Sequence, residues 1–164
     1  MAPEYAHRTM RLHTPNSEEI ATLLTGPLRF CGWTVVEDSL PPSFLLERAL
    51  DTQSTDWLVP RLLIDDGNGE LVGSACFKSE PKDGTVEIGY GVSALRRGRG
   101  LATAGVALLV QEAFASPLVD TVVASTVPTN TASQRVLEKS GFVVTGAGVD
   151  EDEGPVEVWT KRET

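Results

Sequence analysis

The sequence contains few of the residues that usually build metal and redox sites. It has two cysteines, Cys31 and Cys76, and they lie too far apart to form the C-x-x-C pair of a zinc knuckle or a redox dithiol. Its two histidines, His7 and His13, both precede the first predicted helix. We therefore expect no metal, no catalytic triad built on histidine and a reducing, cytoplasmic setting.

Long apolar runs and an excess of positive charge are also missing. The apolar stretch from Ala104 to Val110 is far shorter than the ~20 residues that cross a membrane, and the first residues lack the apolar core of a signal peptide. The 14 basic residues are outnumbered by 23 acidic ones, for a formal net charge of -9. Affinity for nucleic acid comes mainly from basic side chains that neutralise phosphates. We therefore expect neither a membrane nor a nucleic-acid partner.

The remaining composition is that of an ordinary globular protein. The chain has 164 residues, of which 41% are hydrophobic and 23% charged. A chain of this length buries enough surface to be stable without disulfides or metals. No internal repeat and no linker rich in Pro, Gly or Ser divides it. The sequence predicts a single domain over residues 1–164.

The pattern of apolar residues and turn residues predicts a mixed α/β fold. Helices are predicted where apolar residues recur at helical spacing after capping residues, and strands where β-branched and aromatic residues alternate with polar ones. An aromatic loop is expected at 30–33, and 57–92 is expected to form an antiparallel meander. The predicted strands are 8–13, 57–64, 71–78, 85–92, 121–127, 142–145 and 156–161, and the predicted helices are 17–24, 43–50, 98–115 and 131–139.

Three arginines, Arg96, Arg97 and Arg99, precede the long helix that is predicted to be buried. A helix N-terminus carries about half a positive charge, so arginines are unfavourable there unless an anion is bound. Gly98 and Gly100 allow backbone amides to approach such an anion closely. The pattern predicts a phosphate-binding loop, with a basic surface loop as the structural alternative.

Two common phosphate-binding motifs match this stretch poorly. A dinucleotide fingerprint requires glycine where Thr103 stands, and an acidic residue about 20 positions later. Asp120 has the right spacing, but it precedes a predicted strand and does not follow one. A Walker loop is excluded because the Gly-Lys-Ser/Thr ending is missing.

The segment Arg97-Gly98-Arg99-Gly100-Leu101-Ala102 resembles the R/Q-x-x-G-x-G/A signature of the GNAT superfamily of acetyl-CoA-dependent N-acetyltransferases. The resemblance extends to Glu87-Ile88-Gly89-Tyr90-Gly91-Val92 before it and to Asn130-Thr131-Ala132-Ser133 and Gly141-Phe142 after it. Within the superfamily the chain is most similar to the RimJ/RimL-like group. The resemblance implies a GNAT fold, with a central, mostly antiparallel sheet, a splayed parallel strand pair and flanking helices.

The resemblance also implies how acetyl-CoA is bound, without a metal. Backbone amides at the start of the helix at 98–115 would hold the pyrophosphate, the arginines would add positive charge, and the pantetheine arm would lie beside Val92 and Asn130. Asn130 serves equally well as a plain helix cap. The cofactor-binding residues implied are Val92, Arg97, Gly98, Arg99, Gly100, Leu101, Ala102, Thr103 and Asn130.

Two catalytic residues follow from the same resemblance. Glu87 lies on the glycine-bearing face of its strand and matches the family's general base, which deprotonates the acceptor ammonium. An exposed Glu on an alternating strand is the structural alternative. Leu137 stands where most members have the Tyr that protonates the departing thiolate, and RimL-like members use the Ser that corresponds to Ser133. A thiol with a pKa of about 8.5 leaves with little help, so this change is tolerable.

The implied function is acetyl transfer to a primary amine, either a protein N-terminus or a small cationic molecule. Four consecutive acidic residues, Asp150 to Glu153, lie between the last two predicted strands, which border the acceptor site in the family. They would attract a cation, although a solvated hairpin is the structural alternative. A non-catalytic acyl-CoA-binding module is the alternative function, motivated by Leu137, and acetylation of charged tRNA is a third. A homodimer is compatible with the sequence.

Overall fold

The computed structural model describes residues 9–164. Two residues named above lie outside this range: His7, and Arg8, with which the first predicted strand begins. Within it no helix is long and apolar enough to cross a membrane. The elements are β1 Met10–His13, α2 Ser17–Leu23, β2 Arg29–Phe30, β3 Trp33–Val35, α3 Ser43–Ala49, β4 Arg61–Asp65, β5 Glu70–Phe77, β6 Thr85–Val92, α4 Leu101–Phe114, β7 Thr121–Thr126, α5 Thr131–Lys139, β8 Val143–Asp150 and β9 Gly154–Arg162, with short 3₁₀ helices at Asp56–Leu58 and Ala94–Arg96.

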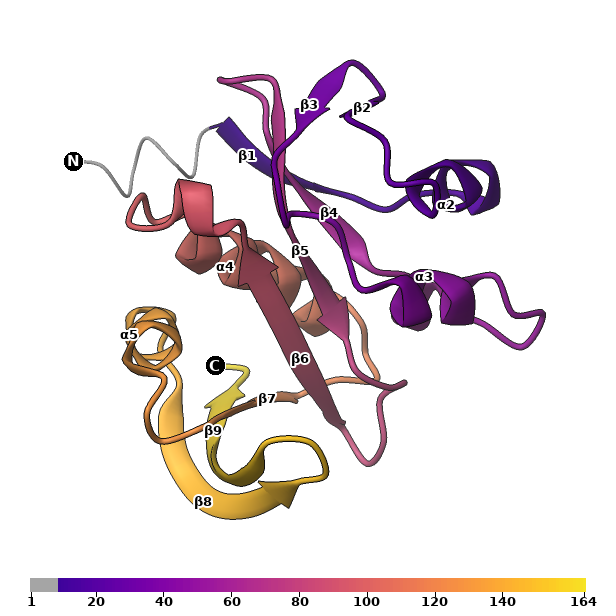
Figure 1. Ribbon diagram of the computed structural model, residues 1–164. Helices are drawn as coiled ribbons and strands as arrows, with labels where there is room; N and C mark the ends of the chain where they lie inside the picture. The colour runs from indigo at the N-terminus through magenta and orange to yellow at the C-terminus, as the bar shows by residue number, and fades with distance from the viewer. Residues whose placement is uncertain (1–8) are drawn as a thin grey trace.

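The strands form one sheet in the order β1-β4-β5-β6-β7-β9-β8, with the small hairpin of β2 and β3 attached to β5. Along this path only β6 and β7 are parallel, and every other pair is antiparallel. Figure 1 shows α4 behind the central strands, α2 and α3 at the right, and α5 near β8 at the lower left. The predicted mixed fold, with its mostly antiparallel sheet and the parallel pair β6–β7, is confirmed, and β3 adds a second, short parallel pairing with β5.

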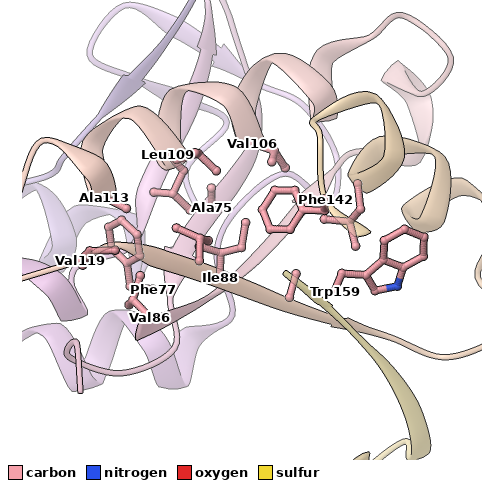
Figure 2. Close-up of a cluster of buried hydrophobic side chains, with 14 residues drawn as sticks. Ala75, Phe77, Val86, Ile88, Val106, Leu109, Ala113, Val119, Phe142 and Trp159 are labelled. Atoms are coloured by element: carbon pink, nitrogen blue, oxygen red, sulfur yellow. The ribbon is translucent and has the colours of Figure 1, made fainter. Parts of the chain in front are cut away.

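Helix α4 packs its apolar side chains on the centre of the sheet. Its sequence is apolar on most sides, and the structure buries Val106 and Leu109 completely. Figure 2 shows these side chains above Ala75 and Ile88 of the strands, with Phe142 and Trp159 at one end of the cluster. Each fully buried side chain of this size stabilises the fold by about 1.5–3 kcal/mol, so this cluster holds the strands on both sides of β6 in place.

The helix starts follow the predicted capping chemistry. The Asn16 side chain accepts a hydrogen bond from the Glu19 amide, and the Glu19 carboxylate accepts one from the Asn16 amide, which completes a capping box. Asn130 caps α5 through the amide of Ser133. Gly141 has a φ of +85° just after α5, as expected for the residue that follows a helix end.

Three details differ from the sequence-based expectations. The expected aromatic loop at 30–33 is a tight hairpin, because Cys31 and Gly32 both adopt positive φ and allow β2 to pair with β3. The first part of the strand expected at 57–64 is a 3₁₀ helix, since Arg61 reaches back to the carbonyl oxygens of Asp56 and Val59. The long helix begins at Leu101 and not at residue 98, because Gly98 and Gly100 are left-handed.

The parallel pair β6 and β7 separates partway along its length. Residues Thr85–Glu87 pair with Thr121–Val123, and the pairing ends there. From Ile88 onward β6 is paired only on its other side, with β5. The splay implied by the resemblance is therefore present, and it starts immediately after Glu87.

The opposite edge of β6 approaches β5 so closely at Gly73 that no side chain fits there. A Cβ built at Gly73 would lie 2.2 Å from the Gly91 carbonyl oxygen and 2.9 Å from the Val92 Cα. Both atoms belong to the backbone, so the two strands would have to move apart. This contact brings the end of β6 to the position where the loop toward α4 begins.

We expect Gly73→Ala to lower the free energy of unfolding by about 1–3 kcal/mol, the usual cost of overpacking. The measurement is chemical denaturation of the full-length protein. Gly91→Ala is the matched control, because a Cβ at Gly91 would meet no atom within 4 Å. Equal stabilities of the two variants would show that the β5–β6 contact is not as tight as described.

Candidate active site

A groove of about 510 Å³ lies between the end of β6, the start of α4 and one side of α5. All but one of the predicted cofactor-binding residues line it, and the exception is Arg99. The predicted residues that line the groove are Val92, Arg97, Gly98, Gly100, Leu101, Ala102, Thr103 and Asn130. Tertiary folding therefore brings the end of β6 and the start of α5 to the loop that the sequence singled out.

The loop before α4 presents free backbone amides to this groove. Gly98 and Gly100 have φ values of +77° and +76°, a conformation that favours glycine. Gly100 is the N-cap of α4 and has no side chain to accept from the first-turn amides, and the first turn has no acidic residue. The amides at a helix start have no acceptor within the helix. Together with the positive end of the helix dipole, they form a site suited to a phosphate group.

The three arginines of the loop have different surroundings. Arg96 is held by Glu70, with hydrogen bonds of 2.9 Å from Nε to Oε1 and 2.6 Å from Nη2 to Oε2. Arg96 also lines the groove, and this pairing compensates part of its charge within the protein. Arg97 lines the groove and is exposed, and Arg99 is exposed outside it.

Two further cations that the sequence analysis did not single out line the groove from α5. They are Arg135 and Lys139, which lie one helical turn apart on the same face. The four-residue spacing of the two cations was the available signal, but only the packing of α5 beside α4 shows that this face borders the loop. The groove thus has positive side chains on both walls.

The Arg96 guanidinium lowers the pKa of the Glu70 carboxyl below its ordinary value, and the charge of Arg99 adds to the effect. The folded-state pKa is therefore below that of the unfolded chain. The stabilisation is complete above pH 4.5, the ordinary value for Glu, and is lost as the pH falls through the lower folded-state pKa. We expect Glu70→Gln to be less stable than wild type at pH 7, with the difference shrinking in acid.

Denaturant unfolding over a pH series measures this difference. Asp66→Asn is the control, because Asp66 and its partner Arg11 are 45% and 47% exposed and form a surface ion pair of little energetic value. A wild-type pH dependence in Glu70→Gln would contradict the assigned role of the pair.

A second cavity, of about 320 Å³, lies where β6 and β7 separate. Its walls include Gly89 on β6, Ser125 on β7 and the hairpin that joins β8 to β9. Tyr90, Asn130 and Ser133 line both this pocket and the groove. These three residues form the shared wall of the groove and the pocket. A group held in the groove can reach a molecule held in the pocket at this wall.

A hydrogen bond between two hydroxyl groups crosses this shared wall. Tyr90 Oη lies 2.7 Å from Ser133 Oγ, and the Ser133 amide donates to Asn130 Oδ1 at 3.1 Å. Burial raises the pKa of the Tyr90 phenol, while the hydrogen bond to Ser133 opposes this shift. Tyr90 is therefore protonated at neutral pH and able to donate.

The acidic hairpin forms the opposite side of the pocket. Asp150, Asp152 and Glu153 all line it, together with Lys78 of the segment after β5. Hydrogen bonds from the amides of Asp152 and Glu153 hold the pKa of the Asp150 carboxyl below its ordinary value. Asp150 is therefore a persistent negative charge suited to attracting a cation, and a weak proton acceptor.

A family model described as an acetyltransferase (GNAT) domain matches residues 9–143. The chain belongs to the GNAT acetyltransferase family. This membership makes it an acetyl-CoA-dependent acyltransferase, as the resemblance predicted. No curated protein sequence matches the chain significantly.

Solved structures of other acetyltransferases share the fold of this GNAT domain. Aminoglycoside acetyltransferase AAC(6')-Ib in complex with coenzyme A is 22% identical, with a TM-score of 0.66 over 94% of this chain and 95% of that one. The ribosomal-protein-S5-alanine acetyltransferase of Vibrio fischeri is 14% identical, with a TM-score of 0.70 over 94% of this chain and 93% of that one. RimL, a ribosomal L7/L12 alpha-N-protein acetyltransferase, is 16% identical in its complex with coenzyme A, with a TM-score of 0.64 over 94% of each chain.

Two residues of this GNAT domain lie differently from what the family pattern suggests. Leu137 is completely buried in the main core, so it cannot reach the groove. Glu87 forms an ion pair with Lys78 at 3.0 Å, and of these two residues only Lys78 lines the pocket. Glu87 thus lies behind Lys78 at the point where the strands separate.

Two aromatic residues of the N-terminal half, Phe30 and Trp57, pack in the interior of this GNAT domain. Phe30 is buried and belongs to a cluster with Ile20 and Leu46. The Trp57 ring stacks edge-on against Phe77, with the ring centroids 4.9 Å apart. These two side chains therefore belong to the interior and not to the walls of the pocket.

Proposed function

We propose that the protein transfers an acetyl group from acetyl-CoA to a primary amine of a cationic acceptor, either a small molecule or a protein N-terminus. One observation carries the proposal. The pocket that joins the phosphate-binding groove at Tyr90, Asn130 and Ser133 has three carboxylates on its far side, against the single ammonium of Lys78. A cavity with an excess of one charge concentrates molecules of the opposite charge.

The groove supplies binding and orientation. The free amides at the start of α4, together with Arg97, Arg135 and Lys139, hold the phosphates of acetyl-CoA. Asn130 and Val92 border the path from these phosphates to the pocket. Fixing the thioester at the shared wall raises the rate by proximity.

Proton transfer belongs to the residues around the shared wall. The acceptor ammonium gives up one proton before its nitrogen attacks the thioester carbonyl, because a protonated amine has no free electron pair. Glu87 is the proposed base. It does not line the pocket itself but is ion-paired with Lys78, which does, so it would act through a water molecule or after Lys78 moves aside. Ser133, hydrogen-bonded to Tyr90, gives a proton to the departing sulfur and is reprotonated by the second proton that the nitrogen loses after attack. The first proton passes from Glu87 to solvent, so one proton is released per acetyl group transferred.

Two of the structurally similar enzymes support a cationic amine as the acceptor. AAC(6')-Ib, an aminoglycoside acetyltransferase, has been crystallised with coenzyme A and kanamycin. RimL is described as an acetyltransferase of the α-amino group of ribosomal protein L7/L12. The carboxylates of the acidic hairpin would attract either kind of acceptor, a small cationic amine or a protein N-terminus.

We expect amines to accelerate thiol release from acetyl-CoA, with a lower KM for polycationic amines than for neutral ones. The double variant Asp152→Asn, Glu153→Gln should raise that KM about 10-fold, the effect of removing about 1.4 kcal/mol of attraction. Glu151→Gln is the matched control. It removes a carboxylate from the same turn, but Glu151 is not among the residues that line the pocket. A KM that is the same in all three proteins would exclude the acidic hairpin from acceptor binding.

The same assay separates the enzyme from a non-catalytic acyl-CoA-binding module. Glu87→Gln should slow thiol release and leave the Kd of coenzyme A unchanged. If coenzyme A binds tightly but no amine in a panel of aminoglycosides, polyamines and peptides accelerates release, the module is the correct function. An affinity for tRNA that falls steeply with salt would favour the third alternative.

A further inference from the structure

Three potential metal ligands meet at the opposite end of the molecule from the acidic hairpin. His13 is the last residue of β1, Glu19 lies in the first turn of α2, and Cys31 lies in the turn between β2 and β3. Their ligand atoms all lie within 4.8 Å of one another. The region containing α2, β2 and β3 is at the upper right of Figure 1, and the groove and pocket described above are formed by other residues.

One carboxylate oxygen is at the centre of the cluster. Glu19 Oε2 lies 3.1 Å from His13 Nε2 and 3.1 Å from Cys31 Sγ. Bond lengths of about 2.0–2.2 Å to nitrogen or oxygen and about 2.3 Å to sulfur place the ligand atoms of tetrahedral zinc about 3.3–3.6 Å apart. The two distances from Glu19 Oε2 are within about 0.5 Å of this range, and the remaining pair, His13 and Cys31, lies within 4.8 Å.

The supporting contacts orient two of the three ligands. Glu19 Oε1 accepts a hydrogen bond of 3.0 Å from the Asn16 amide and also lies 3.2 Å from His13 Nε2, so the Asn16 amide holds the carboxylate beside the imidazole. The His13 ring packs edge-on against Trp33 and Phe30, with centroid distances of 5.5 and 6.3 Å. Partners of this kind fix ligand orientation in protein metal sites.

The third ligand occupies a backbone position that its residue type does not favour. Cys31 has a φ of +50° and is followed by Gly32 at +84°, in a two-residue turn that usually contains Asn-Gly or Gly-Gly. This turn directs the sulfur at Glu19. The side chains of His13 and Glu19 are 25% and 22% exposed, so the cluster is reachable from solvent.

Two arginines border the region of the cluster. The Arg11 guanidinium lies over the Trp33 ring at 4.9 Å and is paired with Asp66. Arg29 donates a hydrogen bond to the Gly32 carbonyl oxygen in the turn that contains Cys31. A site with one imidazole, one carboxylate and one thiolate suits zinc and its neighbours among the transition metals. Calcium and magnesium, by contrast, prefer oxygen ligands alone.

We propose that His13 Nε2, Glu19 Oε2 and Cys31 Sγ bind one zinc-class divalent metal ion, with water in the fourth position. On binding, the Cys31 thiol gives its proton to solvent. The proton that His13 Nε2 shares with the Glu19 carboxylate also leaves, and the neutral imidazole then carries its proton on Nδ1, which frees Nε2 for the metal. The metal would join β1, α2 and the β2–β3 hairpin. It is separate from the acetyl-transfer site, so the proposal does not depend on the acceptor.

The experiment titrates the full-length protein, purified with chelator, with Co²⁺ and with Zn²⁺. We expect one equivalent of Co²⁺ to produce the absorption band of a cobalt-thiolate bond, and Zn²⁺ to displace it and raise the Tm. The two cysteines provide a matched pair of variants. Cys31→Ser and His13→Gln should lose the band or bind at least 100-fold more weakly, whereas Cys76→Ser should behave as wild type.

Four results would overturn the proposal. They are a wild-type protein without the thiolate band, a stoichiometry other than one, loss of binding in Cys76→Ser, or unchanged binding in Cys31→Ser. Circular dichroism of each variant tests whether it is folded. His13→Ala and Glu19→Gln provide a second route if His13→Gln does not fold. Unchanged acetyl-CoA turnover with and without Zn²⁺ is expected, and metal-dependent turnover together with intact binding in Cys31→Ser would place the metal elsewhere.

Discussion

Gly100→Glu is expected to weaken coenzyme A binding about 100-fold or more while the protein remains folded. Gly100 is the N-cap of α4 and lines the groove, and no atom lies within 4 Å of a Cβ built there. The new carboxylate would therefore project into open space beside the amides. Two like charges about 4 Å apart near a protein surface repel by about 4 kcal/mol, which screening reduces. Isothermal titration with coenzyme A measures the effect.

The control must reproduce both the strain and the charge of this change. Gly26→Glu does so, because Gly26 also has a positive φ, of +68°, and open space around its Cβ, but lies after α2. Both variants should lose about 1 kcal/mol of stability, the cost of a left-handed side chain. Only Gly100→Glu should lose coenzyme A. If both variants bind coenzyme A equally well, the loop before α4 is not the phosphate site.

Tyr90→Phe and Ser133→Ala are expected to lower kcat by about 10- to 100-fold, the lower range for loss of a general acid, because a thiolate leaves readily. The two hydroxyls lie 2.7 Å apart on the wall shared by the groove and the pocket. KM for the acceptor should change little, since neither hydroxyl belongs to the acidic hairpin. Steady-state kinetics on the two single variants and the double variant provide the measurement.

The double variant distinguishes a proton donor from a structural contact. If the hydroxyls act as one donor, the double variant should be about as slow as either single variant. Ser125→Ala is the control, because Ser125 also lines the pocket with a hydroxyl but comes from β7. Wild-type kcat in Tyr90→Phe, together with a lower Tm, would mean that the pair merely fastens α5 to β6.

Local sequence was sufficient where local physical chemistry decides the structure. The caps of α2 and α5, the strand from Thr85 to Val92 and the glycine turn before α4 follow from neighbouring residues alone. The pattern of arginines and glycines also indicated most of the groove, because arginines at the positive end of a helix are unfavourable unless an anion binds there. Residues from 30 to 33 were misread as a loop, since a Cys-Gly pair is an unusual hairpin turn.

Only the tertiary structure decided which side chains meet. Tyr90 alternates with Val86 and Ile88 and reads as a core residue, but the strand separation after Glu87 opens its face to the pocket. The sequence suggests Arg96 as an anion ligand, but it does not show that Arg96 is paired with Glu70 of β5.

The same limit applies to His13, Glu19 and Cys31, which are dispersed in the sequence and are brought together by folding. Caps and turns depend on neighbours a few positions apart in the chain. Charge pairing and ligand clustering depend on distances in space, which packing alone determines.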